Sequence, residues 1–322
     1  MTSSDSKVPA GDWVYLEAAL RAIPDLRITP HAPLAPLTTL RIGGPVDWLL
    51  TPQTMEALSG TIALLDQTQT PWITLGAGSN VLFSDEGYRG AVIHTKGLKR
   101  WRIEGHRLIS ESGVYLSQLL GDLKSLGLSG LEFTVGVPVS VGGAVTMNFG
   151  AHGGQISDVL ESARVISSDG SPTVLSKEDL QMGYRSTRIQ KEKECIAEST
   201  FLLIPQDPAL IQKKLDEWNA KRLATQPRPF ANAGSMFKNP PDDYAGRLIE
   251  AADCKGLRVG GMSVSDLHAN FFINDGNGTA KDVRELMAQV QAIVHKTFSV
   301  KLHPEIRMIG FPDSAGPDRL PH

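Results

Sequence analysis

The chain has 322 residues, of which 41% are hydrophobic and 21% charged, a balance that is ordinary for a globular protein and excludes a disordered one. The formal net charge of −3 gives no general attraction to nucleic acid or to an anionic membrane, so any anionic ligand must be bound by local cations. The sequence contains no run of the roughly 18 apolar residues that a membrane span requires. Cys195 and Cys254 lie far apart and are expected to be buried thiols, so we expect a soluble, cytoplasmic protein.

The first part of the chain predicts a small lobe of mixed helix and strand. Apolar residues from Trp13 to Ile23 recur on one helical face behind Asp12, a candidate N-cap. Four prolines between residues 24 and 36 predict an extended connector. Strands are expected over residues 46–50, 73–75 and 91–94, and a helix over residues 54–65.

The segment 72–82 runs from a short apolar strand into a loop with Gly76, Gly78, Ser79 and Asn80. Two glycines allow backbone N–H groups to turn toward one point and form an anion nest, and the two side chains add donors. A tight turn between strands explains the same residues equally well. The dinucleotide fingerprint is incomplete because Val81 stands at its third glycine, so a Rossmann domain is disfavoured.

The rest of the chain continues the alternation of strands and helices, which predicts an α+β fold class. A hairpin is expected around Gly105, then a helix over 115–126 and strands over 160–167, 173–175 and 195–204. Prolines at 205–208 indicate a boundary. Helices over 209–225, 246–252 and 280–298 and a strand over 306–309 follow, and the tail beyond Phe311 is expected to be disordered.

Glycines concentrate between residues 136 and 154. Such a density weakens a buried helix or strand, which indicates that the backbone closely approaches another group. A set of tight turns and bulges is one explanation. The wall of a cofactor pocket is the other, and together with the loop at 76–80 we favour the pocket.

Seven motifs carry a resemblance to a known family. They occupy residues 39–44, 76–80, 141–144, 184–186, 234–240, 265–274 and 304–306. In this order they resemble the motifs of the UDP-N-acetylenolpyruvoylglucosamine reductase (MurB) family, bacterial flavoenzymes of peptidoglycan precursor synthesis. The short interval between Tyr184 and Ser235 is similar to the type II form, which lacks an inserted subdomain.

The resemblance implies a two-lobed FAD-binding domain of the vanillyl-alcohol-oxidase (PCMH) type and a C-terminal α+β substrate domain. In this sequence the implied divisions are an N-terminal helix and connector (1–30), the FAD-binding domain (31–205, with lobes at about 31–97 and 98–205), the substrate domain (206–311) and the tail (312–322). A monomer is expected.

The resemblance also implies that NADPH reduces non-covalently bound FAD, and that the flavin then reduces UDP-N-acetylglucosamine enolpyruvate to UDP-N-acetylmuramate. Hydride addition to the methylene carbon leaves negative charge on the neighbouring carbon, next to the carboxylate. Arg185 would bind that carboxylate, Glu305 would assist if a desolvated site raises its pKa, and Ser235 stands at the proton-donor position. Lys238 is a candidate to assist Ser235.

Binding residues follow from the same motifs. Those expected at FAD are Arg41, Gly76, Gly78, Ser79, Asn80, Gly142, Gly143, Asn148 and Gly153. Those expected at the substrate are Tyr184, Arg188, Lys238, Asn239, His268 and Asn270, with Lys221, Arg222 and Arg228 as further cations for the diphosphate. No metal site is predicted, because His152 and His268 have no metal-ligand spacing.

Several residues depart from the family pattern near the expected cofactor. Thr38, Val139, Phe149 and His152 differ from the usual residues, as do residues 253–254. A valine cannot adopt a positive φ without strain, so the turn at Val139 is expected to be rearranged. Considered one at a time, each catalytic candidate also has a structural explanation. Arg185 is then a surface cation, Glu305 an ion-pair partner and Ser235 a turn residue. A non-catalytic flavin or UDP-sugar binder and an FAD oxidase of another substrate therefore remain as alternatives.

Overall fold

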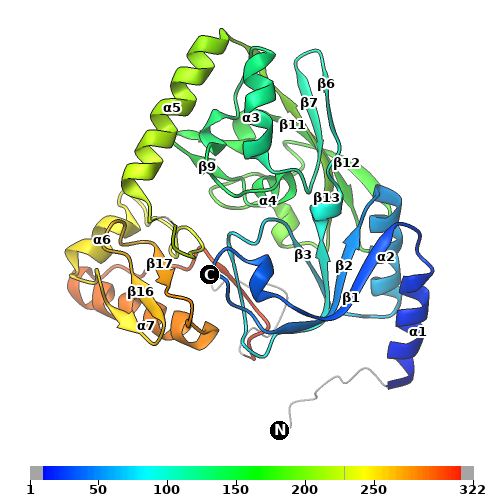
Figure 1. The fold of residues 1–322 in the computed structure, drawn as a ribbon, viewed down its shortest axis with the longest axis horizontal. Helices are drawn as coiled ribbons and strands as arrows, with labels where there is room; N and C mark the ends of the chain where they lie inside the picture. Colours follow the sequence, from blue (N-terminus) through cyan, green and yellow to red (C-terminus); the bar gives the residue numbers. More distant parts are fainter. Residues whose placement is uncertain (1–9, 228, 313–322) are drawn as a thin grey trace.

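The structure is a computed structural model that describes residues 10–227 and 229–312. It contains two larger sheets, one from each half of the N-terminal two thirds of the chain, and a C-terminal segment of helices and short strands (Figure 1). The fold is therefore α+β, as the sequence predicts. Among the described residues, no helix combines the length and the apolar character needed to cross a bilayer.

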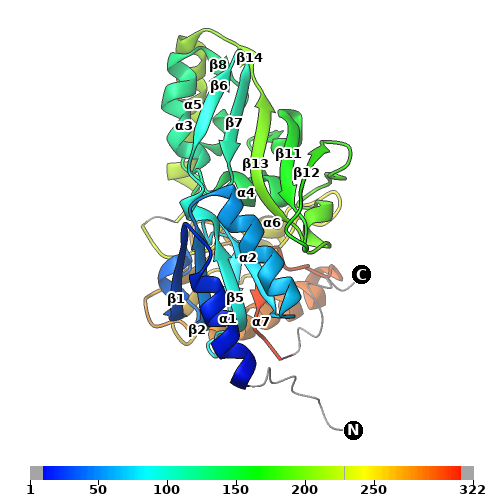
Figure 2. The same cartoon turned by 90° about the vertical axis from the view of Figure 1, so that its right-hand side faces the viewer.

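The first sheet has the strand order β1-β2-β5-β3. Strand β2 pairs antiparallel with β1 and parallel with β5, which in turn pairs parallel with β3. Helices α1 and α2 lie side by side and pack on this lobe (Figure 2). The elements of this part are α1 (Ala10–Arg21), β1 (Leu26–Pro33), η1 (Ala35–Leu37), β2 (Pro45–Pro52), α2 (Met55–Gln67), β3 (Trp72–Leu75), β4 (Val81–Phe83), β5 (Tyr88–His94) and η2 (Thr95–Gly97).

Two local expectations for this part were wrong. The proline-containing connector is largely strand β1, which tolerates proline because it lies at the edge of the sheet, where one side of its backbone has no ladder partner. Helix α1 begins at Ala10, so Asp12 lies inside the helix and is not its N-cap. Strand β4 was not predicted at all, because it is only three residues long.

The second sheet is antiparallel, with the order β12-β11-β13-β7-β6. Helix α4 packs against β13 and β7, on the side of this sheet that faces the glycine-rich loops. The elements are β6 (Trp101–Glu104), β7 (Arg107–Glu111), α3 (Leu116–Ser125), β8 (Leu128–Ser129), η3 (Glu132–Thr134), α4 (Val141–Thr146), β9 (Gly150–Ala151), β10 (Gly154–Gln155), η4 (Ile156–Asp158), β11 (Leu160–Ile166), β12 (Pro172–Ser176), η5 (Arg188–Gln190), β13 (Cys195–Leu202) and β14 (Ile204–Pro205).

The C-terminal segment begins with α5, which extends along one edge of the molecule from the second sheet toward α6 (Figure 1). After α5, the chain forms a small antiparallel sheet of β15, β16 and β17, which packs together with α6 and α7. The elements are α5 (Pro208–Thr225), α6 (Ala245–Ala251), β15 (Arg258–Val259), β16 (Met262–Val264), β17 (Phe272–Asn274), α7 (Ala280–Phe298) and β18 (Arg307–Ile309).

The last strand leaves this segment and returns to the first part of the chain. Strand β18 pairs parallel with β4, and Asp85, just after β4, accepts hydrogen bonds from the first two N–H groups of α7, Ala280 at 2.8 Å and Lys281 at 3.1 Å. The hydrophobic core of the C-terminal segment also includes Leu40 and Leu82 from the first part. The two parts are therefore joined by main-chain pairing, a helix cap and shared core.

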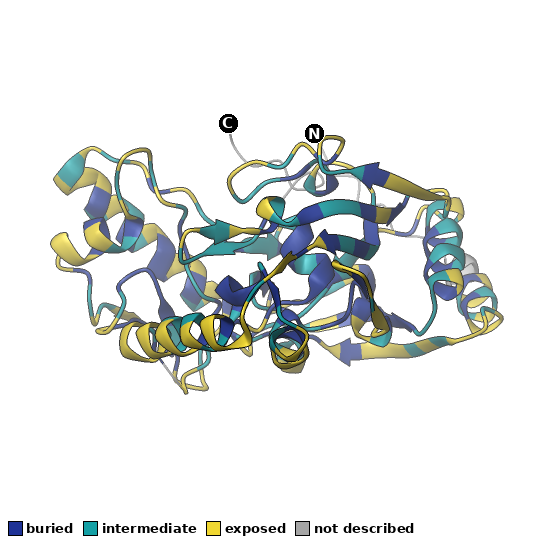
Figure 3. Cartoon of the chain, turned by 90° about the horizontal axis from the view of Figure 1, so that it is seen from above, coloured by how far each residue is buried: buried dark blue, intermediate teal, exposed yellow. Residues whose placement is uncertain are grey.

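Buried side chains occupy the spaces between these layers, and exposed residues line the outer faces of the helices (Figure 3). Both cysteines are free and buried, as expected, and burial raises the pKa of the Cys195 thiol to about 12.

Candidate active site

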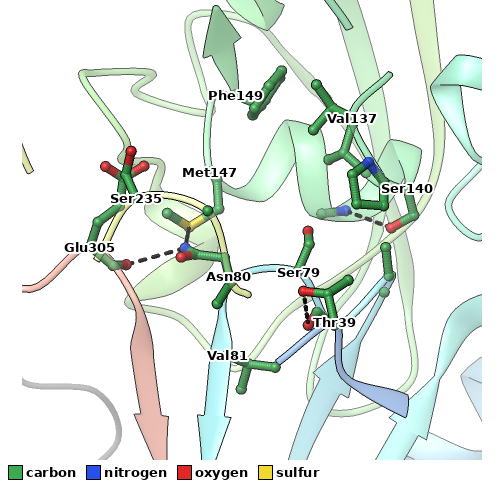
Figure 4. A pocket seen from close by; sticks show the side chains of 18 of the residues that line it. Thr39, Ser79, Asn80, Val81, Val137, Ser140, Met147, Phe149, Ser235 and Glu305 are labelled. Atoms are coloured by element: carbon green, nitrogen blue, oxygen red, sulfur yellow. Dashed lines mark hydrogen bonds between the residues drawn. The ribbon is translucent and has the colours of Figure 1, made fainter. Parts of the chain in front are cut away.

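A cavity of about 800 Å³ opens where the two N-terminal sheets and the C-terminal segment meet. Its walls come from segments far apart in the sequence, including the glycine loop, the glycine-rich stretch around α4 and the turn that carries Ser235 (Figure 4). Predicted site residues that line it are Gly76, Gly78, Ser79, Asn80, Gly142, Gly143, Arg185, Ser235, His268 and Glu305.

The glycine loop at one wall must be built from glycine because other chain segments press against it. A Cβ on Gly76 would lie 2.2 Å from Oγ of Ser140, and one on Gly78, where φ is +65°, would lie 2.1 Å from the carbonyl oxygen of Leu37. The N–H of Thr39 donates to the Gly78 carbonyl at 3.0 Å and fixes the loop. The loop thus presents main chain and small polar side chains to the cavity, which suits a phosphate group.

Helix α4 forms a second wall, although the sequence predicted no helix among these glycines. Ser140 caps it by accepting from the N–H of Gly143 at 3.3 Å. A Cβ on Gly142 would lie 2.8 Å from Cβ of Ser112, so the glycine permits close approach to the turn that follows β7. Val139 has no positive φ and packs in the core, whereas Gly136 in the same turn has a φ of +67°.

Three candidate catalytic residues meet at one end of the cavity. Nε of Arg185 donates to Oε1 of Glu305 at 2.7 Å, and Nη2 donates to the Gly150 carbonyl at 2.8 Å. Ser235 and Glu305 lie next to each other (Figure 4), because the N–H of Glu305 donates to the carbonyl of Met236 at 2.8 Å. The sequence alone allowed simpler explanations, with Arg185 as a surface cation, Glu305 as a solvated ion-pair partner and Ser235 as a turn residue. Their meeting at one end of the cavity does not agree with these explanations.

Two backbone positions in this cluster have a positive φ. Arg185 has a positive φ of +53° and Gly234, before Ser235, one of +71°. A non-glycine residue in the left-handed region is strained and persists only when its surroundings hold it, which is common at functional sites.

Asn80 connects the glycine loop to the catalytic cluster. Its side-chain amide donates to the carbonyl of Glu305 at 3.2 Å, and its own carbonyl accepts from the N–H of Arg307 at 3.2 Å. The position of Glu305 is thus fixed on one side by the loop and on the other by the segment of Ser235.

Opposing effects set the protonation of Glu305. Burial raises the pKa of its carboxyl above the ordinary value and outweighs the positive charges of Arg185 and Lys238, which act to lower it. The side chain is 14% exposed and that of Arg185 is 19% exposed, so the pair is shielded from solvent screening. The group can therefore hold a proton at a higher pH than an exposed glutamate.

Three predicted cofactor residues do not line the cavity. Arg41 and Gly153 lie outside its wall, and Asn148 is buried behind it. The Asn148 amide donates to the carbonyl of Gly183 at 3.0 Å and its oxygen accepts from the N–H of Ser157 at 3.0 Å. Asn148 therefore joins two loops of the wall.

Four of the six predicted substrate residues line a cavity: His268 lines the larger one, and three others line a second one. Tyr184, Lys238 and Asn239 line a second cavity of about 440 Å³, together with Lys301 and His303. This places the Lys238 side chain at a different cavity from Ser235, although its charge acts on Glu305. The second cavity is nevertheless adjacent to the catalytic end of the first, because Tyr184 precedes Arg185 in the chain.

Three further predicted residues have local partners. Asn270 is buried and pairs with both main-chain groups of Phe237, and His268, whose pKa is lowered chiefly by burial, accepts from the N–H of Asn270. Arg188 forms an ion pair with Glu194 at 2.6 Å and lines neither cavity.

Of the cations suggested for the diphosphate, Arg222 lines the larger cavity, Lys221 lines neither cavity, and Arg228 lies outside the described residues. His152 stacks on Trp218 of α5, with ring centroids 5.3 Å apart. Within residues 10–227 and 229–312, no cluster of potential metal ligands occurs.

Arg307 was not predicted as a site residue, yet it lines the larger cavity two residues after Glu305. The signal was present in the sequence, because residues i and i+2 of an extended segment face the same side. Thr39 and Gln226 also line the cavity, and no motif identified Gln226.

Comparisons with known proteins agree with this geometry. Residues 226–309 match the family model described as UDP-N-acetylenolpyruvoylglucosamine reductase, C-terminal domain, and residues 46–176 match that of an FAD binding domain. The UDP-N-acetylenolpyruvoylglucosamine reductase of Clostridium botulinum (strain Okra / Type B1) is 42% identical over 278 residues, which cover 86% of this chain and 91% of the relative. That of Carboxydothermus hydrogenoformans is 43% identical over 284 residues, 88% of this chain and 94% of the relative.

A solved structure is also similar. The UDP-N-acetylenolpyruvylglucosamine reductase (MurB) of Thermus caldophilus superposes with a TM-score of 0.76 at 34% identity, over 88% of this chain and 99% of that one.

Proposed function

Because the chain belongs to the UDP-N-acetylenolpyruvoylglucosamine reductase family and is an FAD-dependent oxidoreductase, we propose how its own residues carry out the reduction of UDP-N-acetylglucosamine enolpyruvate in peptidoglycan precursor synthesis. The observation that carries the proposal is the meeting of Arg185, Glu305 and Ser235 at one end of a cavity whose other walls are the glycine loop and α4.

The cavity fits FAD. Gly76, Gly78, Ser79 and Asn80 provide the polar, side-chain-poor wall that a pyrophosphate requires, and Val137, Val139 and Phe149 provide apolar surface for a ring system. FAD, when bound, supplies the hydride, which it has received from NADPH. The protein residues contribute binding, orientation and proton transfer.

Arg185 binds the carboxylate of the enolpyruvyl group. Its guanidinium has five N–H donors, of which the contacts to Glu305 and Gly150 use two, so donors remain for a third acceptor. Binding there places the substrate carboxylate near Glu305. A neutral Glu305 avoids repulsion between the two carboxyl groups, which is consistent with the raised pKa.

Ser235 donates the proton that completes the reduction. After hydride reaches the methylene carbon, the adjacent carbon carries the negative charge and accepts the Ser235 hydroxyl proton. The serine oxygen regains a proton from protonated Glu305 beside it, and Glu305 is reprotonated from solvent (Figure 4). Glu305, rather than the Lys238 suggested by sequence, is the neighbour that supports Ser235.

The second cavity binds the diphosphate end of the substrate. Lys238 and Lys301 supply positive charge, and Asn239 and Tyr184 supply hydrogen-bonding groups beside the catalytic end. This division corresponds to an FAD-binding domain over 31–205 and a substrate domain over 206–311 whose last strand rejoins the first domain. A nucleotide-sugar substrate supports a cytoplasmic enzyme.

An anaerobic spectral titration tests the proposal. NADPH is expected to bleach the flavin absorbance band, and UDP-N-acetylglucosamine enolpyruvate is expected to restore it. The Ser235→Ala variant should bleach normally and recover about 10²- to 10⁴-fold more slowly, because only the second step needs its proton. Bleaching without recovery in the parent enzyme would point to an oxidoreductase of another substrate, and the lack of a flavin band would point to a binding protein.

A further inference from the structure

The loop that carries Arg185 is held by a residue that no motif identified. The side-chain amide nitrogen of Gln190 lies 3.1 Å from the carbonyl oxygen of Arg185 and 2.9 Å from that of Thr146, at the end of α4. It also lies 3.2 Å from Sδ of Met147. One amide therefore connects the main chain of Arg185 to the wall that is expected to contact the cofactor.

This connection is needed because of the conformation of Arg185. With a φ of +53°, Arg185 occupies a region that side chains rarely adopt, and surrounding contacts must hold it there. Two main-chain hydrogen bonds between Gly183 and Ser186, at 2.9 and 3.2 Å, close the turn that contains Arg185, and Gln190 adds a bond to the Arg185 carbonyl. The contacts of the guanidinium with Glu305 and Gly150 fix the far end of the side chain, whereas Gln190 fixes the backbone from which it starts.

The chemistry of the amide suits this role. An amide –NH₂ has two N–H donors, one for each of the two carbonyl oxygens, and it carries no charge that would disturb the Arg185–Glu305 pair. Gln190 is itself fixed, because its main-chain N–H donates to the carbonyl of Thr187 at 3.2 Å within η5.

We propose that Gln190 is a positioning residue for the reduction of the enolpyruvyl substrate, because it holds the main chain of Arg185 so that the guanidinium can bind the substrate carboxylate. The inference depends on the carboxylate-binding role given to Arg185 above. It assigns Gln190 no contact with substrate or cofactor, and Gln190 lines neither cavity.

The two half-reactions separate this role from a general effect on folding. NADPH has no carboxylate for Arg185 to bind, so flavin reduction does not need Arg185 in place, whereas reoxidation by the enolpyruvyl substrate does. Misplacement of a binding group by about 1 Å can slow a reaction about a hundredfold. Gln190→Met, which is similar in length but has no donor, is therefore expected to slow reoxidation about tenfold to a hundredfold and to change flavin reduction by less than about twofold.

The loop offers a matched control. The hydroxyl of Thr187 donates to the same Thr146 carbonyl at 2.7 Å, but it makes no such bond to Arg185. Thr187→Val therefore removes a bond between the same loop and α4 and is expected to leave both half-reactions near the parent rates. Stopped-flow absorbance of the flavin, with NADPH and then with UDP-N-acetylglucosamine enolpyruvate, measures both steps.

The outcomes distinguish failure of the proposed enzyme activity from failure of the role given to Gln190. If the parent enzyme is not reoxidised by the enolpyruvyl sugar, the proposed function fails, and the inference fails with it. If the parent is reoxidised and Gln190→Met matches it, or if both variants slow reoxidation equally, Gln190 is not a positioning residue. Equal losses in both half-reactions of Gln190→Met, or a loss of bound flavin, would likewise show a purely structural role.

Discussion

At the scale of single residues, Glu305 combines burial with an ion pair, and its protonation should control the second half-reaction. Its pKa is raised, so the neutral form persists at a higher pH than in an exposed glutamate. The reoxidation rate should therefore be high below the raised pKa and should fall as pH increases through it. Any stability that depends on neutral Glu305 is lost over the same rise in pH.

The Glu305→Gln variant tests this pH dependence. Glutamine does not titrate and has no acidic proton to pass to Ser235. The variant should therefore be reoxidised more slowly than the parent at low pH and should lack the decline of the reoxidation rate at high pH. Glu194→Gln is the matched control, since Glu194 is a partly buried carboxylate paired with Arg188 away from both cavities. A Glu305→Gln variant that keeps the same decline would assign the titration to another group.

The sequence identified the three residues that meet at the cavity because each stands in a local motif. It could not show that Lys238 faces a different cavity from Ser235, since three residues of irregular chain set no fixed direction for a side chain. It also could not show the role of Gln190, because the Thr146 carbonyl that its amide shares with the Arg185 loop lies in a distant segment. Motifs thus revealed which chemical groups are present, and the fold determined which of them meet.

At the scale of secondary-structure elements, the beginning of α7 depends on a residue far away in the chain. The Asp85 carboxylate accepts from the first two N–H groups of the helix, while Thr279 accepts from the third. The Asp85→Ala variant should lower the free energy of unfolding by about 1 kcal/mol, because two helix N–H groups lose their acceptor and the helix dipole loses a favourable charge. Denaturant unfolding measures this.

The control for this prediction is Asp169→Ala, which removes an exposed aspartate that bonds to Ser171 in its own turn. If Asp85→Ala lowered the free energy of unfolding no more than this control does, the contact between Asp85 and α7 would contribute little to stability.

The long helices were predicted well, among them α2, α3, α5 and α7. Prediction failed where tertiary contacts decide the local structure. Edge position allowed β1 to contain prolines, and close packing on Ser112 together with the Ser140 cap allowed α4 to form among glycines. Neither condition can be read from the residues of the element itself.

At the scale of the whole molecule, FAD should contribute to stability because its expected cavity is walled by both N-terminal sheets and the C-terminal segment. Removal of FAD should lower the Tm, and FAD at 100 times its Kd should restore about 2.7 kcal/mol. Differential scanning calorimetry of the apo and reloaded protein measures the change. FMN, which lacks the adenylate and the pyrophosphate, is the matched control. If FMN restored the Tm as fully as FAD does, the glycine loop would not bind the pyrophosphate.

The α+β class and the family followed from the sequence, whereas the pairing of β18 with β4 did not. A strand of three residues carries no signal for its partner, because the choice depends on which edge the folded chain leaves open.

The return of β18 to β4 also affects how the enzyme is made. Asn80 and Glu305 are in contact but 225 residues apart, so the catalytic end cannot form until nearly the whole chain has left the ribosome. Contacts of such sequence separation slow folding, and the edge of β4 stays unpaired while synthesis continues. During that interval the nascent chain presents an open strand edge, so aggregation competes with completion of the active site.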